Sequence, residues 1–197
     1  TGVQTCALPI YFYPTEDDNT ALKRFRAGEL DTQERWPTQA QSWLKAHAGT
    51  EARRVPQLST IFLSFNLKRK PFDDVRVRKA LAMAIDTDVI TDSVYQGAYG
   101  QAANAYLPPG TVNVDNTATV AWAGQPIEAR RAEARKLLAQ AGFTDAKPLT
   151  FTYRFISVAD IKKGAVALQE MWQKIGVKGD RKSTRLNSSH LVISYAV

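Results

Sequence analysis

The amino-acid sequence predicts an α/β or mixed α+β fold in which helices alternate with single strands. Two segments, 127–141 and 160–174, carry apolar residues at helical spacing, and a glycine follows soon after each. Two shorter segments, 58–66 and 149–155, alternate apolar and polar residues, which is typical of a half-buried strand. Because the two kinds of segment alternate along the chain, helices are expected to cover a sheet in layers.

Two short helices are expected before the first strand. Asn19 or Thr20 can cap the first helix, and Gly28 can end it in a left-handed conformation. The second helix is expected over 38–48. Its stripe consists of Ala40, Trp43, Leu44 and His47.

The first strand, expected over 59–67, has two different faces. One face carries Ile61, Leu63 and Phe65, and the other carries Thr60, Phe62, Ser64 and Asn66. Pro71 cannot continue a strand, and Asp73 or Asp74 can cap the helix that follows, 74–85. The apolar face of that helix consists of Val77, Leu81, Ala84 and Ile85.

The second half of the chain is expected to add three helices and one strand. A helix over 88–96 precedes a loop over 97–124 that is rich in Gly, Pro, Asn and Thr. A helix over 127–141, a strand over 149–155 and a helix over 160–174 follow. The helical stripes consist of Ala134, Leu137, Leu138 and Ala141, and of Ile161, Ala165, Leu168, Trp172 and Ile175.

The two ends of the chain are related through their coding strands. Thr1–Ile10 can be written as ACT GGA GTT CAG ACG TGT GCT CTT CCG ATC, and the opposite strand then translates as DRKSTRLNSS, which is Asp180–Ser189. This DNA resembles a sequencing-library adapter, and residues 190–197 fit its continuation around a short barcode. We therefore expect residues 1–10 and 180–197 to be adapter-derived and residues 11–179 to be an internal fragment of a longer gene. The alternative is a genuine terminal strand, LVISYAV.

Composition argues against several kinds of site. The only cysteine, Cys6, lies in the N-terminal end, so no disulfide, zinc cluster or thiol nucleophile is expected in residues 11–179. The whole chain has 26 basic and 19 acidic side chains, a net charge of +7, and residues 11–179 have 23 and 18, a net charge of +5. The densest basic cluster combines 68–70 with the basic residues of 76–79. A solvated face is favoured there over contact with nucleic acid.

The sequence contains no motif of a hydrolase, a nucleotide-binding loop or a metal site. G-x-S-x-G, Walker and H-E-x-x-H patterns are missing, and no His/Cys pairs occur. His47 is the only histidine in residues 11–179, and a lone histidine at a helix end is usually a surface or capping residue. We expect a protein that is not an enzyme and has no cofactor. No apolar run approaches the roughly 20 residues of a membrane-spanning helix.

The segment Lys70–Asp86, KPFDDVRVRKALAMAID, resembles a signature of the peptide- and nickel-binding family of bacterial ABC-importer substrate-binding proteins. The family pattern is a strand ending in Asn, here Asn66, followed by PPF-D-RVR-AL--AID. Four further segments resemble the family in family order: TALKRFRAGELD at 20–31, EARKLLAQAGF at 133–143, PLTFTY at 148–153 and LQEMWQKIGVK at 168–178. The spacing is most similar to the oligopeptide-binding branch.

The resemblance implies a fragment of a two-lobed, type II periplasmic-binding-protein-like fold. Residues 11–58 would end the first-lobe portion, and residues 59–179 would begin the second, C-terminal lobe. The implied function is non-catalytic binding of oligopeptides between two lobes and their delivery to the permease and ATPase complex of an ABC importer. The implied location is periplasmic or lipid-anchored outside the cytoplasm, with the signal sequence missing from this fragment. Membrane contact would come only through the importer or a lipid anchor on the missing N-terminus, and no nucleic acid is implied.

Two alternatives to peptide delivery stay open. A cytoplasmic regulator can carry the same ligand-binding domain behind a DNA-binding region. The ligand can also be a nickel chelate or an oligosaccharide instead of a peptide. The parent gene and its neighbours would distinguish these alternatives.

The resemblance also implies ligand-binding residues in three places. The loop after Asp31 falls where relatives line the cleft, and Phe62 and Ser64 lie on the strand face that looks into it. Tyr95 falls near a position where one relative uses Lys for a peptide carboxylate, and Ile161 replaces a histidine used similarly, which leaves the preferred peptide length open. The loop residues are Gln33, Glu34, Arg35 and Trp36.

Each of these residues also has a structural interpretation. Trp36 stands next to Pro37 and can pack at a helix entry, Phe62 can belong to a core, and Tyr95 can be a surface aromatic at a helix end. Arg76 and Arg78 are expected to make structural ion pairs and not ligand contacts.

Overall fold

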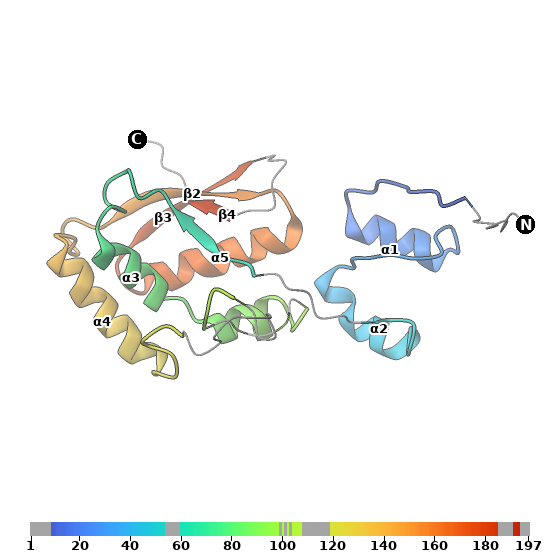
Figure 1. Cartoon of the computed structure of the whole chain (residues 1–197), viewed down its shortest axis with the longest axis horizontal. Coiled ribbons are helices and arrows are strands. Elements are labelled where there is room, and N and C mark those ends of the chain that lie inside the picture. The colour runs from blue at the N-terminus through green and yellow to red at the C-terminus, as the bar shows by residue number, and fades with distance from the viewer. Residues whose placement is uncertain are drawn as a thin grey trace, which may run out of the picture. The chain divides into compact units, whose positions relative to one another are not determined.

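The structure is a computed structural model that describes residues 9–53, 60–98, 100, 102, 104–107, 119–184 and 191–193. It divides the chain into two compact units, Thr1–Gly49 and Thr50–Val197. Figure 1 shows a small helical unit and a larger unit in which helices pack against strands.

The smaller unit begins with helix α1, Asp18–Arg26. Its N-cap is Asp17, whose carboxylate accepts hydrogen bonds from the backbone N–H of Thr20 at 2.8 Å and from the Thr20 hydroxyl at 2.7 Å. The prediction that Asn19 or Thr20 caps the helix is therefore wrong, because Thr20 is the donor. Gly28 follows the helix with φ 73°, and its predicted role at the end of the helix is confirmed.

The second predicted helix of this unit forms in two parts. A 3₁₀ turn, η1 (Thr38–Ala40), leads into helix α2 (Gln41–His47). Leu44 is buried, whereas His47 is exposed and its ring stacks on Trp43 with 4.8 Å between centroids. The predicted stripe is thus only partly buried, and His47 is a surface residue as expected.

The described residues of the larger unit form four strands in two parallel pairs (Figure 1). Strand β2 (Thr150–Ile156) pairs with β3 (Lys178–Thr184), and β1 (Leu63–Phe65) pairs with β4 (Leu191–Ile193). Strand β4 also lies beside β2. The strand predicted over 59–67 forms only over Leu63–Phe65. Residue 59 of the predicted range lies outside the described residues.

The helices of the larger unit follow the predicted positions closely. They are α3 (Val75–Met83), α4 (Ile127–Gln140) and α5 (Ala159–Gln173). The helix predicted over 88–96 is a π-helical segment, η2 (Val89–Val94). Half of the loop predicted over 97–124 lies outside the described residues.

The core lies between the strands and these helices. Trp172 of α5 is completely buried, and its indole N–H donates a hydrogen bond of 3.1 Å to the carbonyl of Leu81 in α3. Its ring packs edge-to-face on Phe151 and Tyr153 of β2, at centroid distances of 5.2 and 5.3 Å. The edge-to-face geometry is one that aromatic pairs prefer. This cluster joins the helices that the apolar stripes predicted to the strand between them.

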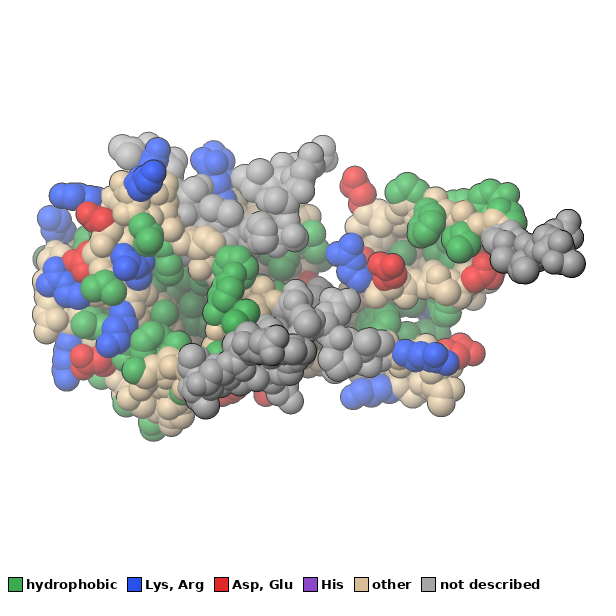
Figure 2. Space-filling model, in the orientation of Figure 1, with side chains coloured by type: hydrophobic (Ala, Val, Ile, Leu, Met, Phe, Trp, Pro, Cys, Tyr) green, Lys and Arg blue, Asp and Glu red, His purple; other side chains and the backbone are tan. Residues whose placement is uncertain are grey.

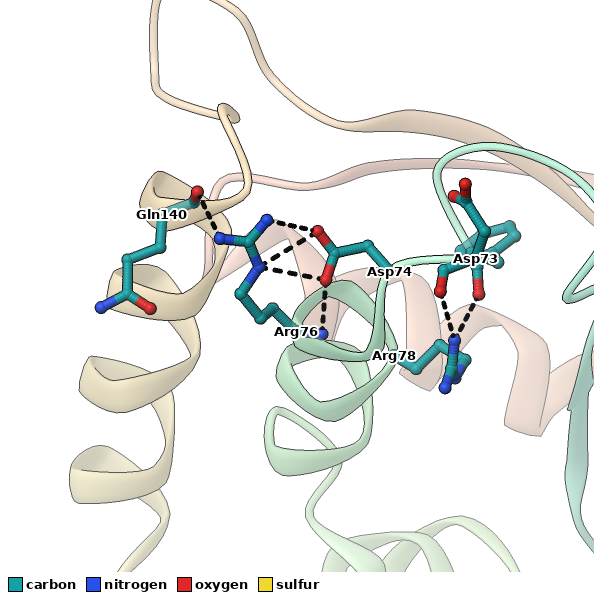
Figure 3. A network of polar contacts seen from close by, with 6 residues as sticks. Asp73, Asp74, Arg76, Arg78 and Gln140 are labelled. Atoms are coloured by element: carbon teal, nitrogen blue, oxygen red, sulfur yellow. Dashed lines mark hydrogen bonds and ion pairs between the residues drawn. The ribbon is translucent and has the colours of Figure 1, made fainter.

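Helices α3 and α4 are joined at both ends by arginine side chains. Arg76, in the first turn of α3, donates a hydrogen bond of 2.8 Å to the carbonyl of Gln140, the last residue of α4 (Figure 3). Arg130, in the first turn of α4, donates one of 3.2 Å to the carbonyl of Ile85, just after α3. Carbonyls at helix C-termini lack partners within the helix, so each arginine satisfies one of them.

Asp74 caps α3 and holds Arg76 in place. Its carboxylate accepts hydrogen bonds from the backbone N–H of Arg76 at 2.8 Å and from the Arg76 guanidinium at 2.6 Å (Figure 3). The bonds from Arg76 lower the pKa of Asp74 below its ordinary value. Arg78 donates to the carbonyls of Phe72 and Asp73. These contacts are structural, as expected for Arg76 and Arg78.

Strand β3 extends beyond the last element that the sequence predicted. Up to Gly179 the residues alternate between buried and exposed: Val177 and Gly179 are buried, and Lys178 is exposed. From Asp180 to Ser183 every side chain is exposed, although the backbone continues to pair with β2. Residues 180–184, which are expected to be adapter-derived, thus continue this strand.

Candidate functional site

The predicted ligand-binding residues are distributed over both units of the chain. Gln33, Glu34, Arg35 and Trp36 belong to the smaller unit, whereas Phe62, Ser64 and Tyr95 belong to the larger one.

The loop Gln33–Trp36 leads from α1 toward η1. Gln33 is half-buried, and its amide N–H donates to the carbonyls of Asp18, at 3.4 Å, and Arg35. Glu34 and Arg35 are exposed, and Trp36 is half-buried directly before the buried Pro37. The amide of Gln33 therefore fixes the loop to α1, while two charged side chains and part of an indole ring face outward.

The core face that the alternation predicted around strand β1 forms only in part, because Ile61, assigned to it with Leu63 and Phe65, is 53% exposed. Leu63 and Phe65 pack against the hydrophobic core, and the ring of Phe65 lies 5.2 Å from that of the fully buried Phe72. Phe62 and Ser64 alternate with them and are half-buried. Phe62 is not a member of the core cluster of described residues. The alternation therefore places Phe62 and Ser64 together on the face opposite the core, where they are available to a ligand.

The aromatic neighbour of Phe62 is Tyr106, a residue that the sequence analysis missed. The two rings meet edge-to-face, with 5.3 Å between centroids and an interplanar angle of 64°. Tyr106 is 65% exposed. The sequence shows only an aromatic residue in a loop rich in Gly and Pro. This pattern does not indicate which strand the loop approaches.

Tyr95 lies at the end of η2 and packs against α5. Only 6% of its surface is exposed. Gly164 of α5 makes room for it, because a Cβ atom at Gly164 would lie 2.3 Å from the Tyr95 hydroxyl. Burial, and secondarily the charge of Asp160, raise the pKa of Tyr95. A ligand can therefore reach little of this side chain in the conformation described, although its role in binding stays a prediction.

The part of the candidate site that lies in the larger unit offers groups that can bind a ligand. The face of β1 offers a ring and a hydroxyl, and Thr60–Asn66 contains no charged residue. Within the described ranges no three His, Cys, Asp or Glu side chains are grouped so that they could hold a metal ion. No helix of the described part is long and apolar enough to cross a membrane. In Figure 2, Lys and Arg side chains over α3 and α4 are interspersed with acidic and hydrophobic ones.

Solved structures define the class of fold. The murein tripeptide binding protein MppA of Escherichia coli matches with a TM-score of 0.81 at 29% sequence identity, over 87% of this chain and 34% of that one. The mixed arrangement of helices and strands is therefore part of a type II periplasmic-binding-protein fold.

The sequence comparison defines the family. A model of the bacterial extracellular solute-binding proteins, family 5 (Middle), matches residues 9–190, and the chain belongs to this family. The periplasmic oligopeptide-binding protein OppA of Salmonella typhimurium is 34% identical over 197 residues, covering 96% of this chain and 36% of the relative. OppA of Escherichia coli is 36% identical over 178 residues, covering 89% and 32%. The chain thus spans about a third of the length of these curated relatives.

Proposed function

We propose that the whole protein to which this chain belongs is a receptor that binds short peptides and delivers them to an ABC importer without catalysis. The observation that carries the proposal is the match of nearly the entire chain to proteins named as periplasmic oligopeptide-binding proteins. The face of β1 that points away from the core supports it, because Phe62 and Ser64 combine an apolar ring with a hydrogen-bonding group. Ligand sites in proteins are commonly built in this way.

The proposed mechanism is closure of two lobes over an extended peptide. Main-chain hydrogen bonds would supply most of the affinity, and roomy side-chain pockets would allow many sequences. In this arrangement Ser64 is a hydrogen-bonding residue and Phe62 an apolar contact on one wall. Gln33, Glu34, Arg35 and Trp36 belong to the other wall, and Tyr95 lies near the end of the peptide. Residues 11–58 and 59–179 would each supply part of one lobe.

The proposed location is periplasmic or lipid-anchored outside the cytoplasm, and the proposed partners are the permease and the ATPase of the importer. The periplasmic location named for the relatives supports this. A permease gene and an ATPase gene beside the parent gene would agree with delivery. A helix-turn-helix region encoded upstream in the same gene would instead support a cytoplasmic regulator.

We also propose that residues 1–10 and 180–197 are adapter-derived and not part of the natural protein. The antisense relation between Thr1–Ile10 and Asp180–Ser189 supports this proposal. The burial pattern of β3 supports it independently, because alternation stops after Gly179. Sequencing the parent gene from its source DNA tests the proposal: codons for DRKSTRLNSS after Gly179 would overturn it.

The experiment that tests the function is calorimetry with the complete protein encoded by the parent gene. We expect binding of tri- to pentapeptides, and Ser64→Ala and Trp36→Ala are each expected to weaken it by roughly 1 kcal/mol, about the contribution of one hydrogen bond or packed side chain. Val75→Ala, at an exposed position of α3, is the matched control. A protein that ignores peptides but binds a nickel chelate or an oligosaccharide would overturn the proposal.

A further inference from the structure

Phe62 and Tyr106 form an aromatic corner on the larger unit. Their rings lie 5.3 Å apart at 64°, so the edge of one ring meets the face of the other. Tyr106 keeps 65% of its surface exposed although it is in contact with Phe62. Tyr106 can therefore touch a further apolar group while it stays in contact with Phe62.

The segment that carries Tyr106 is attached to the rest of the unit by its backbone. The carbonyl of Asn104 accepts a hydrogen bond of 2.9 Å from the N–H of Val120. Phe62, for its part, precedes β1, whose Leu63 and Phe65 are anchored on the core. Each ring thus belongs to a segment that has a contact to the rest of the unit within two or three residues: Asn104 before Tyr106, and Leu63 and Phe65 after Phe62.

The residues that flank the two rings in the sequence carry no formal charge. Thr60–Asn66 and Asn104–Leu107 contain only neutral residues. A charged group placed against the two aromatic rings would lose water without gaining a partner of opposite sign from these segments. An uncharged apolar group would bury surface there at no such cost.

We propose that Tyr106 is a specificity-determining residue that, together with Phe62, receives an uncharged apolar or aromatic side chain of the bound peptide. The inference rests on the proposed peptide-binding function and adds a chemical preference to it. Ser64, two residues after Phe62, would then offer its hydroxyl to the peptide backbone beside that side chain. The corner therefore selects a side chain, whereas the backbone contacts do not.

The test is calorimetry of the complete protein with Ala-Ala-Ala and with the same tripeptide carrying Phe, Lys or Glu at each position in turn. The wild type is expected to prefer Phe at one position. Tyr106→Ala is expected to weaken binding of that Phe peptide by about 2- to 12-fold, the range for an aromatic pair, and to leave Ala-Ala-Ala nearly unchanged. Tyr106→Phe keeps the ring and is expected to retain the preference.

Two further variants make the result unambiguous. Tyr106→Lys places a positive charge at the corner and is expected to favour the Glu peptide over the Phe peptide. Val75→Ala, far from the corner in sequence and exposed on α3, is the control for folding and is expected to behave as the wild type.

The outcomes separate this inference from the proposed function. If the wild type binds no peptide, both are wrong. If it binds peptides but Tyr106→Ala weakens all of them equally, or keeps the preference for Phe, the role of Tyr106 is wrong and the proposed function stands.

Discussion

Strands β2 and β3 pair over their whole length but contribute to the fold in different ways. In β2, Phe151, Tyr153 and Phe155 are buried and alternate with partly exposed residues. In β3, burial ends with Gly179, which lies against the ring of Trp172, and the side chains from Asp180 to Ser183 are exposed. The two strands therefore share hydrogen bonds but not a core.

The difference teaches that backbone pairing and side-chain burial are separate contributions to a strand. A backbone hydrogen bond contributes a net ~1 kcal/mol, and ordering one residue costs ~1–2 kcal/mol of conformational entropy. Without apolar burial the two nearly cancel, so the part of β3 after Gly179 is expected to add little stability. The buried rings of β2 contribute the additional free energy of apolar burial that stabilises this strand.

The strongest test of this comparison is Trp172→Ala. The indole ring is fully buried between α3 and β2, and its removal leaves a cavity and an unpaired carbonyl at Leu81. We expect a loss of about 3–5 kcal/mol in the free energy of unfolding, measured by urea denaturation. Arg181→Ala, an exposed position in β3, is the matched control and should stay within about 0.5 kcal/mol. Similar losses at the two positions would contradict the comparison.

A second test uses Gly179, the last buried position of β3. An added Cβ would lie 3.3 Å from Cε3 of Trp172, a ring that is packed on every side and has little room to yield. Gly179→Ala is expected to cost about 1 kcal/mol, since the overpacking exceeds the gain from a less flexible unfolded chain. Ser183→Ala, farther along the same strand, should be nearly neutral. Thermal unfolding of both variants measures the difference, and a stabilised Gly179→Ala would show that the ring can move.

The acid stability of α3 sharpens the comparison, because the first turn of this helix is held by a polar contact at the surface in addition to its buried apolar face. The pKa of Asp74 is lowered from 3.8 by bonds from Arg76. A carboxyl whose pKa is lowered in the folded state contributes stability above the unfolded value, and this contribution disappears as the pH falls through the folded value. Asp74→Asn should therefore lower the melting temperature near neutral pH and have no effect in strong acid. An equal effect at both pH values would point to capping alone.

The smallest effect is expected from removing residues 1–10 and 180–197 together. The deleted part of β3 buries no side chain from Asp180 to Ser183. We expect a loss below ~1 kcal/mol, the size of a typical single substitution. Urea unfolding of the shortened and the full chain measures it. A much larger loss would show that backbone pairing, of β3 with β2 and of β4 with β1, stabilises the fold without side-chain burial.

The sequence predicted those helices and strands that have a pattern in their own residues. It did not predict those that form only because of contacts with residues far away in the sequence. Helices α4 and α5 have apolar stripes and a following glycine, Gly142 or Gly176, in a left-handed conformation, so their positions were predicted closely. The segment KGDRKST of β3 has no alternation, and it is a strand because the edge of β2 accepts it. Its pattern alone therefore could not indicate a strand.

The candidate site shows the same limit. The alternation of β1 predicted that Phe62 and Ser64 lie on the face opposite the core, which the packing of Leu63 and Phe65 on the core supports. The burial of Tyr95 depends on the space left by Gly164, a residue far away in the sequence. No local pattern around Tyr95 contains that information.

The two arginine bonds between α3 and α4 have a consequence for how this unit tolerates change. Because the first turn of each helix supplies a donor to a carbonyl at or just after the end of the other helix, unwinding of one helix end removes a bond from its neighbour. Amide protons at the two paired ends should therefore exchange with solvent together, as one cooperative unit. The helices are held at both ends independently of the chain that connects them. Insertions in the segment that connects the two helices should thus be tolerated, because they leave both arginine bonds in place.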